Sequence, residues 1–331
     1  MNNDNVKVGI AGMGFYFPET KVYTKTIADD LEMSEKTYNH IGVNSIYVPT
    51  DKEQSAYMAL EAAKDALDNA GIKADEIHAI IASTFKSDYM HWQLSNYIKD
   101  GLKADNALAL DVKGGCAAYF ESIQIAVDQI RADCEMKNIL VVSGERLYGY
   151  GWPTFLSSGG QAVVLQKEYD DFNYIDFAIC NYVKYHDMAL VYQGGTACPF
   201  TKDLEWNGSD FVGNVVVKNE MYFENIKPYV FEKFVWVANK VLNRSGYSLK
   251  DIDYMISLVQ QDNFDKRVLE AIGRTDIPTA QEFKKDIGHF SGGDIYVLLD
   301  KAQKSKRIKK GDLILVLGIG GVAWFATLIK Y

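Results

Sequence analysis

The sequence has few cysteines and no excess of positive charge. Its four cysteines are spread over 331 residues, with no CxxC pair of the kind that holds a metal ion, so no metal site is expected. The formal net charge of −9 argues against nucleic acid as the main partner, because phosphate binding needs a concentrated basic face. The one dense basic stretch, residues 301–310, lacks stacking aromatic residues and is expected to be a solvated helix end.

Long apolar segments are also missing. No apolar run approaches the roughly 20 residues that a helix needs to span a bilayer. A short polar lead runs directly into the apolar residues 6–11, without the pattern of a signal peptide. Together with the few cysteines, these absences predict a soluble protein of the reducing cytoplasm, without a membrane partner.

The sequence does contain an internal repeat, offset by about 175 residues. Residues 63–81 align with residues 238–256, with alanine, leucine, glycine and aliphatic positions in register. Each copy has the pattern of an amphipathic helix, a glycine stop, a polar turn and a buried strand. The apolar runs 139–144 and 313–318 keep nearly the same offset. Two such α/β halves would pack on each other, so a site shared between them is the first place to look for chemistry.

The same patterns predict the elements of both halves. For a first half, residues 1–171, we expect strands at 6–11, 77–84, 107–111, 138–143 and 161–165, and helices at 55–70, 94–102 and 117–130. For a second half, residues 172–331, we expect strands at 174–180, 188–193, 252–259, 313–319 and 322–330, and helices at 225–244 and 263–272. A further helix is expected to begin in the glycine-rich residues 288–294, and the connection 194–224 stays ambiguous.

Cys116 is the candidate nucleophile of the first half. It follows a predicted strand and two glycines and opens an apolar helix, so its sulfur would lie at the positive end of the helix dipole. The glycines would let substrate and backbone approach the sulfur closely. Free cysteine is also among the most commonly buried residues, so position alone leaves a structural role open.

Three segments, in this order, resemble the thiolase superfamily and, within it, β-ketoacyl-ACP synthase III: residues 9–18, 111–120 and 318–324. The resemblance implies a thiolase-like α/β fold, in which two repeated βαβαβαββ halves form a five-layered α-β-α-β-α core. It also implies that Cys116 accepts the acyl group, and that the backbone N–H groups of Cys116 and Gly320 form an oxyanion hole.

The same resemblance implies the substrates and the assembly. No permanently bound cofactor is expected, because the substrate is itself a thioester of coenzyme A or of phosphopantetheine. The expected partners are therefore acyl-CoA or an acyl-carrier protein. A homodimer is expected as well, because superfamily members form dimers across the sheet of the first half.

Two catalytic residues of the family are replaced in this chain. Residues 259–263 align with the family segment Pro-His-Gln-Ala-Asn, which places Gln260 at the position of the histidine. Residues 288–291 align with Gly-Asn-Thr-Ser, which places His289 at the position of the asparagine. Gln260 retains an N–H donor, and His289 can donate, accept or take the thiol proton. We therefore predict Cys116, His289 and Gln260 as catalytic residues and Asn263, Gly321 and Ser291 as substrate-binding residues.

The family's carrier-binding positions differ as well. Lys36 and His40 occupy the positions of the family's tryptophan and arginine that hold the coenzyme A nucleotide. Neither can stack on adenine as a tryptophan does, which implies a different acyl donor or a differently shaped entrance for the pantetheine arm. The basic residue that meets the carrier protein falls at Asp265, although Lys266 and Arg267 stand beside it.

Two aromatic segments are candidates for the lining of the acyl pocket and its entrance. These are residues 86–92 and residues 148–155. Ordinary aromatic packing is an equally good interpretation of both.

The favoured function is that of an acyltransferase that loads an acyl group on Cys116. The acyl group then passes to a malonyl-type carbon in a decarboxylative Claisen condensation, in fatty-acid or specialised metabolism. Non-condensing transfer to a hydroxyl or amine is the first alternative. A catalytically silent subunit of a heterodimeric synthase is the second, and retention of Cys116 argues against it. Thioester hydrolysis with His289 as base stays open, whereas the absence of a cysteine after Cys198 disfavours a degradative thiolase.

Overall fold

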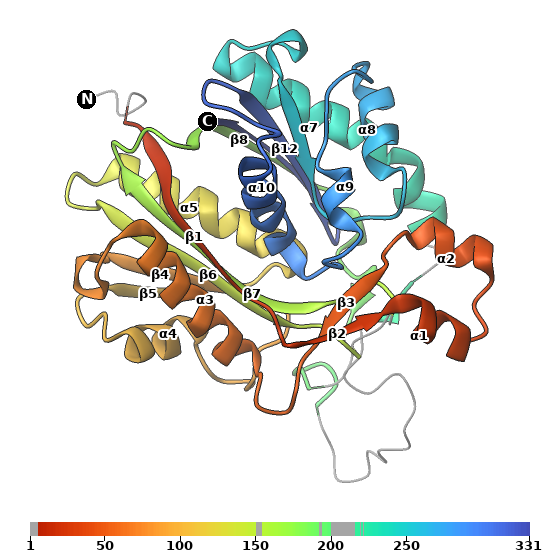
Figure 1. Cartoon of the computed structure of the whole chain (residues 1–331), viewed down its shortest axis with the longest axis horizontal. Helices are drawn as coiled ribbons and strands as arrows, with labels where there is room; N and C mark the ends of the chain where they lie inside the picture. Colours follow the sequence, from red (N-terminus) through yellow and green to blue (C-terminus); the bar gives the residue numbers. More distant parts are fainter. Residues whose placement is uncertain (1–5, 150–153, 192–193, 200–215, 219, 221) are drawn as a thin grey trace.

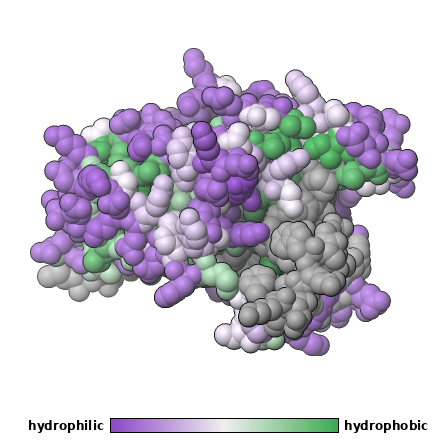
Figure 2. Space-filling model, turned by 90° about the horizontal axis from the view of Figure 1, so that it is seen from below, coloured by the Kyte–Doolittle hydropathy of each residue, from purple (hydrophilic) through white to green (hydrophobic). Residues whose placement is uncertain are grey.

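A computed structural model describes residues 6–149, 154–191, 194–199, 216–218, 220 and 222–331. Two β-sheets and the helices that cover them make up most of this part of the chain (Figure 1). Among the described residues, no helix combines the length and the apolar character needed to cross a membrane. Hydrophilic side chains cover much of the surface seen from below, with small apolar patches between them (Figure 2).

The first sheet contains five strands in the order β1-β7-β6-β4-β5. Strand β4 pairs in parallel with both β5 and β6, whereas β7 runs antiparallel to β6 and β1. Helices α3 and α4 cover its outer face. The strands are β1 (Val8–Tyr16), β4 (Ala79–Ser83), β5 (Leu108–Val112), β6 (Asn138–Arg146) and β7 (Ser158–Lys167), and the helices are α3 (Ser55–Ala70) and α4 (Leu94–Leu102).

The second sheet repeats this arrangement with four strands, in the order β11-β12-β13-β8. Helices α7 and α8 cover its outer face. At the edge that corresponds to β5, a single parallel bridge between Met255 and Thr279 takes the place of a full strand. The strands are β8 (Asn173–Asn181), β11 (Tyr254–Ser257), β12 (Leu313–Gly320) and β13 (Ala323–Lys330), and the helices are α7 (Val230–Ser245) and α8 (Phe264–Ile272).

Helices α5 (Ala118–Ala132) and α10 (Asp294–Lys304) form the layer between the sheets. The alternation of side chains along each strand explains the layers. In β4, Ile81 packs into the central layer, whereas Ile80 packs against the outer helices. In β11, Ile256 packs centrally and Met255 outward. The predicted five-layered α-β-α-β-α thiolase-like fold is thus confirmed.

The internal repeat has a direct structural counterpart. Helices α3 and α7 begin at Ser55 and Val230, and strands β4 and β11 begin at Ala79 and Tyr254, which is an offset of 175 residues in both cases. Gly71 and Gly246 end the two helices in the left-handed conformation, at φ values of 65° and 74°. An L-residue adopts this conformation at a cost, which is why both copies stop at glycine.

Several short elements connect and extend the two sheets. A hairpin and two short helices between β1 and α3, which the sequence analysis did not predict, lie beside the second sheet's loops (Figure 1). They are β2 (Thr20–Tyr23), α1 (Thr24–Asp30), α2 (Glu35–Ile41) and β3 (Ser45–Val48). The remaining elements are β9 (Ala189–Leu190), β10 (Val216–Val217), α9 (Gln281–Lys284) and the single turns Ala74–Glu76, Gly115–Ala117, Val183–Tyr185, Tyr222–Ile226, Lys227–Tyr229, Leu249–Asp251 and Ser291–Gly293.

Several predicted elements differ in extent from those observed, among them the following three. The first strand extends from Val8 to Tyr16, well beyond residue 11. The strand expected at 188–193 is reduced to two residues, Ala189–Leu190. The helix expected at 225–244 begins as a regular α-helix only at Val230, because Pro228 lies in the tight turn before it and has no N–H to continue a helical hydrogen-bond pattern.

Candidate active site

Cys116 lies between the two sheets, at the entrance to the central helix α5. It is half-buried, in the single turn Gly115–Ala117 that follows β5 and precedes Ala118. Gly115 has a φ of 63°, which glycine adopts without strain. The predicted position of Cys116 at a helix start is therefore confirmed, and the residue lies at the positive end of the helix dipole.

His289 contacts the sulfur of Cys116 from the second half of the chain. The Cys116 Sγ and His289 Nε2 atoms are 3.5 Å apart. The backbone of His289 is fixed on both sides, since its N–H donates to the Phe155 carbonyl at 2.9 Å and its carbonyl accepts from the Ser157 N–H at 2.8 Å. The Phe155 ring also stacks on the imidazole, with centroids 5.3 Å apart. Nε2 is therefore held toward the sulfur.

Asp294, which sequence reasoning missed, holds the other side of the imidazole. Its Oδ2 atom lies 2.5 Å from His289 Nδ1 and 3.0 Å from the Val259 N–H. Its Oδ1 atom accepts from the Phe290 N–H at 2.9 Å. Asp294 is fully buried at the first position of α10. Cys116, His289 and Asp294 thus form a linear thiol–imidazole–carboxylate arrangement, the geometry of a catalytic triad.

The carboxylate determines the charge of the imidazole. Burial alone would lower the pKa of His289, but the charge and hydrogen bond of Asp294, with a smaller contribution from Cys116, raise that pKa well above 6.5. An imidazolium is therefore favoured at neutral pH. The imidazolium can donate a hydrogen bond from Nε2 toward the sulfur, which lies 3.5 Å away.

The backbone of Gly320 meets the backbone of Cys116 at the site. Gly320 ends β12, and a Cβ atom built on it would lie 2.4 Å from the Ala117 nitrogen and 2.9 Å from the Cys116 carbonyl carbon. No side chain fits in that space. The two backbone segments predicted to form an oxyanion hole therefore lie side by side.

The other predicted site residues lie in different settings. Gln260 is half-buried directly after Val259, whose N–H binds Asp294. Asn263 is exposed, and its amide donates to the Asp262 carboxylate at 3.2 Å. Gly321 is exposed in the turn between β12 and β13, and Ser291 is 1% exposed. Within the described part of the chain, no hydrogen bond joins any of these four residues to the Cys116 sulfur.

Glu145 is a second buried acid near the site that the sequence analysis did not identify. It lies near the end of β6 at 2% exposure, where it accepts from the Phe85 N–H at 3.0 Å and from the Ser143 hydroxyl at 3.0 Å. Burial raises the pKa of Glu145 to about 7, although hydrogen bonds from Phe85, Ser143 and Ser291 and the charge of His289 act in the opposite direction. This carboxyl therefore changes charge close to neutral pH.

The raised pKa of Glu145 predicts a pH-dependent effect of Glu145→Gln on stability. The folded protein resists ionisation of Glu145, so its stability falls as the pH rises from the ordinary value of 4.5 to about 7. The neutral glutamine avoids this loss. We expect Glu145→Gln to gain up to about 3 kcal/mol relative to wild type between pH 5 and pH 8, measured by urea unfolding. Exposed Glu135→Gln is the control, and an identical difference at both pH values would contradict the assignment.

The position that aligns with the family's carrier-facing basic residue is not on the surface. Asp265 is 2% exposed and pairs with Lys284, whose Nζ atom lies 2.6 Å away. The first turn of α8 directs Asp265 inward, so this position cannot serve as a carrier contact in this chain. Lys266 is 71% exposed, and the Arg267 guanidinium lies 4.4 Å from the centroid of the Phe231 ring.

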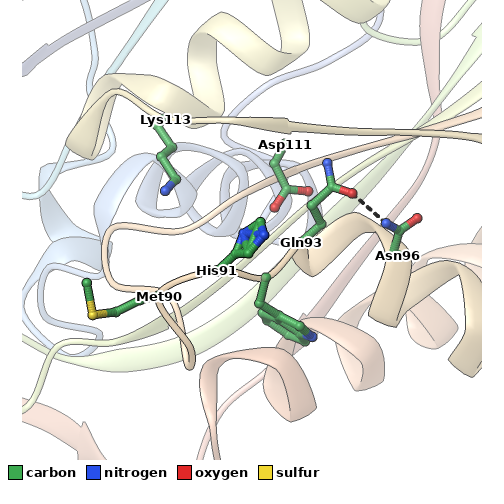
Figure 3. A pocket seen from close by; sticks show the side chains of 7 residues that line it. Met90, His91, Gln93, Asn96, Asp111 and Lys113 are labelled. Carbon is green, nitrogen blue, oxygen red and sulfur yellow. Dashed lines mark hydrogen bonds between the residues drawn. The ribbon is translucent and has the colours of Figure 1, made fainter.

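The two segments expected to line the acyl pocket lie in different settings. Residues 90–92 of the first segment line a pocket together with Gln93, Asn96, Asp111 and Lys113, beside the edge strand β5 (Figure 3). Asp111 also caps α4, since its two carboxylate oxygens accept from the Leu94 and Ser95 N–H groups at 2.8 and 2.9 Å.

The second segment includes residues 150–153, which lie outside the described residues. Its last residue, Phe155, packs with Phe85 around the buried pair Leu147 and Leu156. A small apolar cluster thus adjoins the ring of His289.

Comparisons with known proteins agree with this fold. The model of the 3-oxoacyl-[acyl-carrier-protein] synthase III C-terminal region matches residues 242–331. The β-ketoacyl-[acyl-carrier-protein] synthase III of Rickettsia rickettsii is 24% identical over 330 residues, covering 97% of this chain and 99% of that protein. The corresponding protein of Clostridium perfringens is 28% identical over 338 residues, covering 97% and 98%. The crystal structure of the synthase III from Aquifex aeolicus superposes with a TM-score of 0.77 at 22% identity, covering 98% of this chain and all of that chain.

A thiolase-like fold with a cysteine at the start of its central helix defines a class of acyltransferases. Within that class, the chain is similar to β-ketoacyl-ACP synthase III over its whole length, and its C-terminal region matches the model of that family. The resemblance inferred from residues 9–18, 111–120 and 318–324 is confirmed.

Proposed function

We propose that the protein transfers an acyl group from a coenzyme A or acyl-carrier-protein thioester to Cys116. The observation that carries this proposal is the contact of Cys116 Sγ with His289 Nε2 at 3.5 Å, with Asp294 2.5 Å behind the imidazole. The thiolate attacks the thioester carbonyl, and the oxyanion accepts hydrogen bonds from the Cys116 and Gly320 N–H groups. The carbon–sulfur bond to the carrier then breaks, and the His289 imidazolium gives its proton to the leaving thiolate.

For the second step we propose decarboxylative condensation. A malonyl thioester loses carbon dioxide, and the resulting carbanion attacks the acyl carbon on Cys116. A carbon–carbon bond forms, the acyl–sulfur bond breaks and the Cys116 thiolate is restored. After the carrier thiol leaves, His289 takes up a proton from solvent; it then donates from Nε2 to the oxygen of the malonyl thioester while negative charge develops there, and Gln260 supplies the second donor. The names and folds of the relatives support this assignment.

One observation favours the alternative of non-condensing transfer. Asp294 raises the pKa of His289, so the neutral imidazole is a strong proton acceptor. Once Cys116 is acylated and its charge is gone, His289 could deprotonate a hydroxyl or amine acceptor.

Acylated enzyme incubated with carboxyl-labelled malonyl-carrier protein and, in parallel, with a small hydroxyl or amine nucleophile separates the two functions. Condensation releases one labelled carbon dioxide for each acyl group consumed. Ester or amide formation without carbon dioxide favours the alternative. If no thioester forms a Cys116-dependent adduct, the protein is instead a silent subunit.

We further propose that the physiological acyl donor is a carrier protein of the cytoplasm. On α2, Lys36 and His40 occupy the positions of the family's nucleotide-binding pair. Helix α2 contacts the loop before α8, because the Asp262 N–H donates to the His40 carbonyl at 3.0 Å. On α8, Lys266 and Arg267 lie on the exposed side. Two exposed basic residues, together with the replacement of the nucleotide-binding pair, suit an acidic carrier protein more than a free nucleotide.

Reversal of this charge provides the test. Lys266→Glu/Arg267→Glu is expected to lower kcat/KM for an acyl-carrier protein about tenfold at low salt, because it removes steering of an acidic partner. The value for acyl-CoA should stay unchanged. Lys304→Glu, at the far end of α10 and 74% exposed, is the control. Equal losses with both donors would point to damage of the site and contradict carrier docking.

A homodimer through the first sheet is also proposed. Strand β5 is an edge strand and exposes Leu108 and Leu110 by 59% and 39%. An exposed apolar edge strand promotes aggregation, and pairing with a second copy of the chain would cover it. Leu108→Asp/Leu110→Asp is expected to shift the sedimentation coefficient from dimer to monomer, with Leu31→Asp, exposed by 54% on another surface, as control. A wild-type monomer at micromolar concentration would contradict this proposal.

A further inference from the structure

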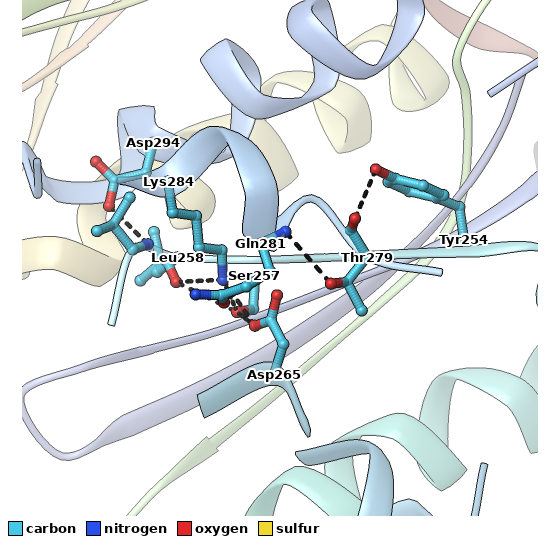
Figure 4. Close-up of polar contacts among 9 residues, drawn as sticks. Tyr254, Ser257, Leu258, Asp265, Thr279, Gln281, Lys284 and Asp294 are labelled. Carbon is cyan, nitrogen blue, oxygen red and sulfur yellow. Dashed lines mark hydrogen bonds and ion pairs between the residues drawn. The ribbon is translucent and has the colours of Figure 1, made fainter. Parts of the chain in front are cut away.

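A lysine is buried in the interior, one peptide group away from the carboxylate of the triad. Lys284, the last residue of α9, is 2% exposed. Its ammonium donates to the Asp265 carboxylate at 2.6 Å, the Ser257 hydroxyl at 2.7 Å and the Leu258 carbonyl at 3.1 Å (Figure 4). All three N–H groups of the ammonium are thus used.

Asp265 is equally buried and compensates the charge of Lys284. Its Oδ1 atom accepts from Lys284 and from the Ser257 hydroxyl at 2.5 Å, whereas its Oδ2 atom has no hydrogen-bond partner among the described residues. Burial of two charges costs several kcal/mol for each ion, and well-packed apolar residues are often as stable. Stability alone therefore gives little reason for an ion pair at this place.

The Leu258–Val259 peptide connects this pair to the triad. Its carbonyl accepts from Lys284, and its N–H donates to Asp294 Oδ2 at 3.0 Å. That same oxygen lies 2.5 Å from His289 Nδ1. A cation at the carbonyl end polarises the peptide and strengthens the hydrogen bond that its N–H donates. The contacts thus run without interruption from Asp265 through Lys284 and one peptide to Asp294.

We propose that Lys284 and Asp265 are a positioning pair for catalysis: they fix the Leu258–Val259 peptide so that its N–H holds Asp294 against His289. The proposal rests on the proposed function, in which Asp294 orients His289 for acyl loading of Cys116. The pair acts through the peptide and touches no substrate.

The test replaces both charges together. Lys284→Met/Asp265→Leu keeps the side-chain volume without leaving a single buried charge, so it is expected to melt at or above the wild-type temperature. Acyl loading of Cys116 should slow by about 10- to 100-fold, the scale on which outer-shell partners act, with an unchanged KM for the thioester. The NMR signal of the His289 Nδ1 proton should move upfield because its hydrogen bond to Asp294 weakens.

Two further variants complete the design. Lys284→Gln/Asp265→Asn keeps a neutral donor for the Leu258 carbonyl, so it should fold and recover part of the loading rate. Arg307→Met/Glu282→Leu removes a surface ion pair, 2.7 Å between Nε and Oε1, that also involves α9, and should change neither readout. Wild-type loading and an unshifted proton signal in both buried-pair variants would overturn the proposal. If the wild-type enzyme forms no acyl adduct at Cys116 but the His289 Nδ1 proton signal still shifts in the buried-pair variants, the proposed function is wrong. The link between the buried pair and Asp294 is then still supported.

Discussion

Asp294→Asn is expected to slow acyl loading of Cys116 by about 10³-fold. The equivalent change in a serine triad costs about 10⁴-fold, because the amide favours the wrong tautomer of the histidine. A thiol is a better nucleophile than a hydroxyl, so we expect a smaller loss of rate when the carboxylate is replaced. Because Asp294 also raises the pKa of His289, loss of this carboxylate should slow the alkylation of Cys116 by iodoacetamide at neutral pH. Both rates can be followed by intact-mass spectrometry.

The matched control lies on the same helix. Asp300→Asn changes an acid of α10 whose partner is Lys304 at 2.9 Å, and should leave both rates unchanged. Circular dichroism and melting temperature establish that each variant is folded. A folded Asp294→Asn enzyme that loads the acyl group and is alkylated at the wild-type rates would show that the carboxylate does not act on His289.

Gly320→Ala is expected to lower kcat for acyl transfer by about 10²- to 10³-fold. The new methyl group would lie 2.4 Å from the Ala117 nitrogen, so the end of β12 or the start of α5 must move. Movement of either segment separates the two N–H groups of the proposed oxyanion hole. Loss of one such donor has an effect of this size in comparable sites.

Gly311→Ala is the control for the effect of a methyl group near β12. Gly311 precedes the other end of the strand, and a Cβ atom there would meet nothing within 4 Å. Its φ of 94° makes the change mildly destabilising, but the site is distant, so activity should be retained. Equal activity of Gly320→Ala and wild type would rule out Gly320 as an oxyanion donor.

The long elements were predictable because local and tertiary signals agree in them. Helices 55–70 and 94–102 were predicted with the observed bounds, since an amphipathic pattern coincides with clear stop signals. The hairpin and helices between Thr20 and Val48 were not predicted. Their elements span only four to seven residues, and α2 buries none of its own, so the sequence contains no periodic apolar pattern there.

The candidate site was predictable as far as residue types follow the family pattern. Cys116 and His289 were assigned from aligned segments, and the structure brings them together. Asp294 was missed, because no motif places an acid there and its contact with His289 depends on the turn at 291–293. Its position in the first turn of a helix is the signal that could have identified it.

The buried charges were the least predictable feature. Glu145, Asp265 and Lys284 belong to residue types that are almost always exposed, so a sequence alone assigns them to the surface. Their burial follows from where the ends of β6, α8 and α9 meet other segments, which is a tertiary property.

The most direct test of the account is intact-mass spectrometry of the wild-type chain and Cys116→Ala after incubation with acyl-CoA and acyl-carrier protein. We predict one acyl group on the wild-type chain, located at Cys116 by peptide mapping, and none on the variant. An adduct that persists in Cys116→Ala, or no adduct on wild type with either donor, would contradict acyl transfer through Cys116.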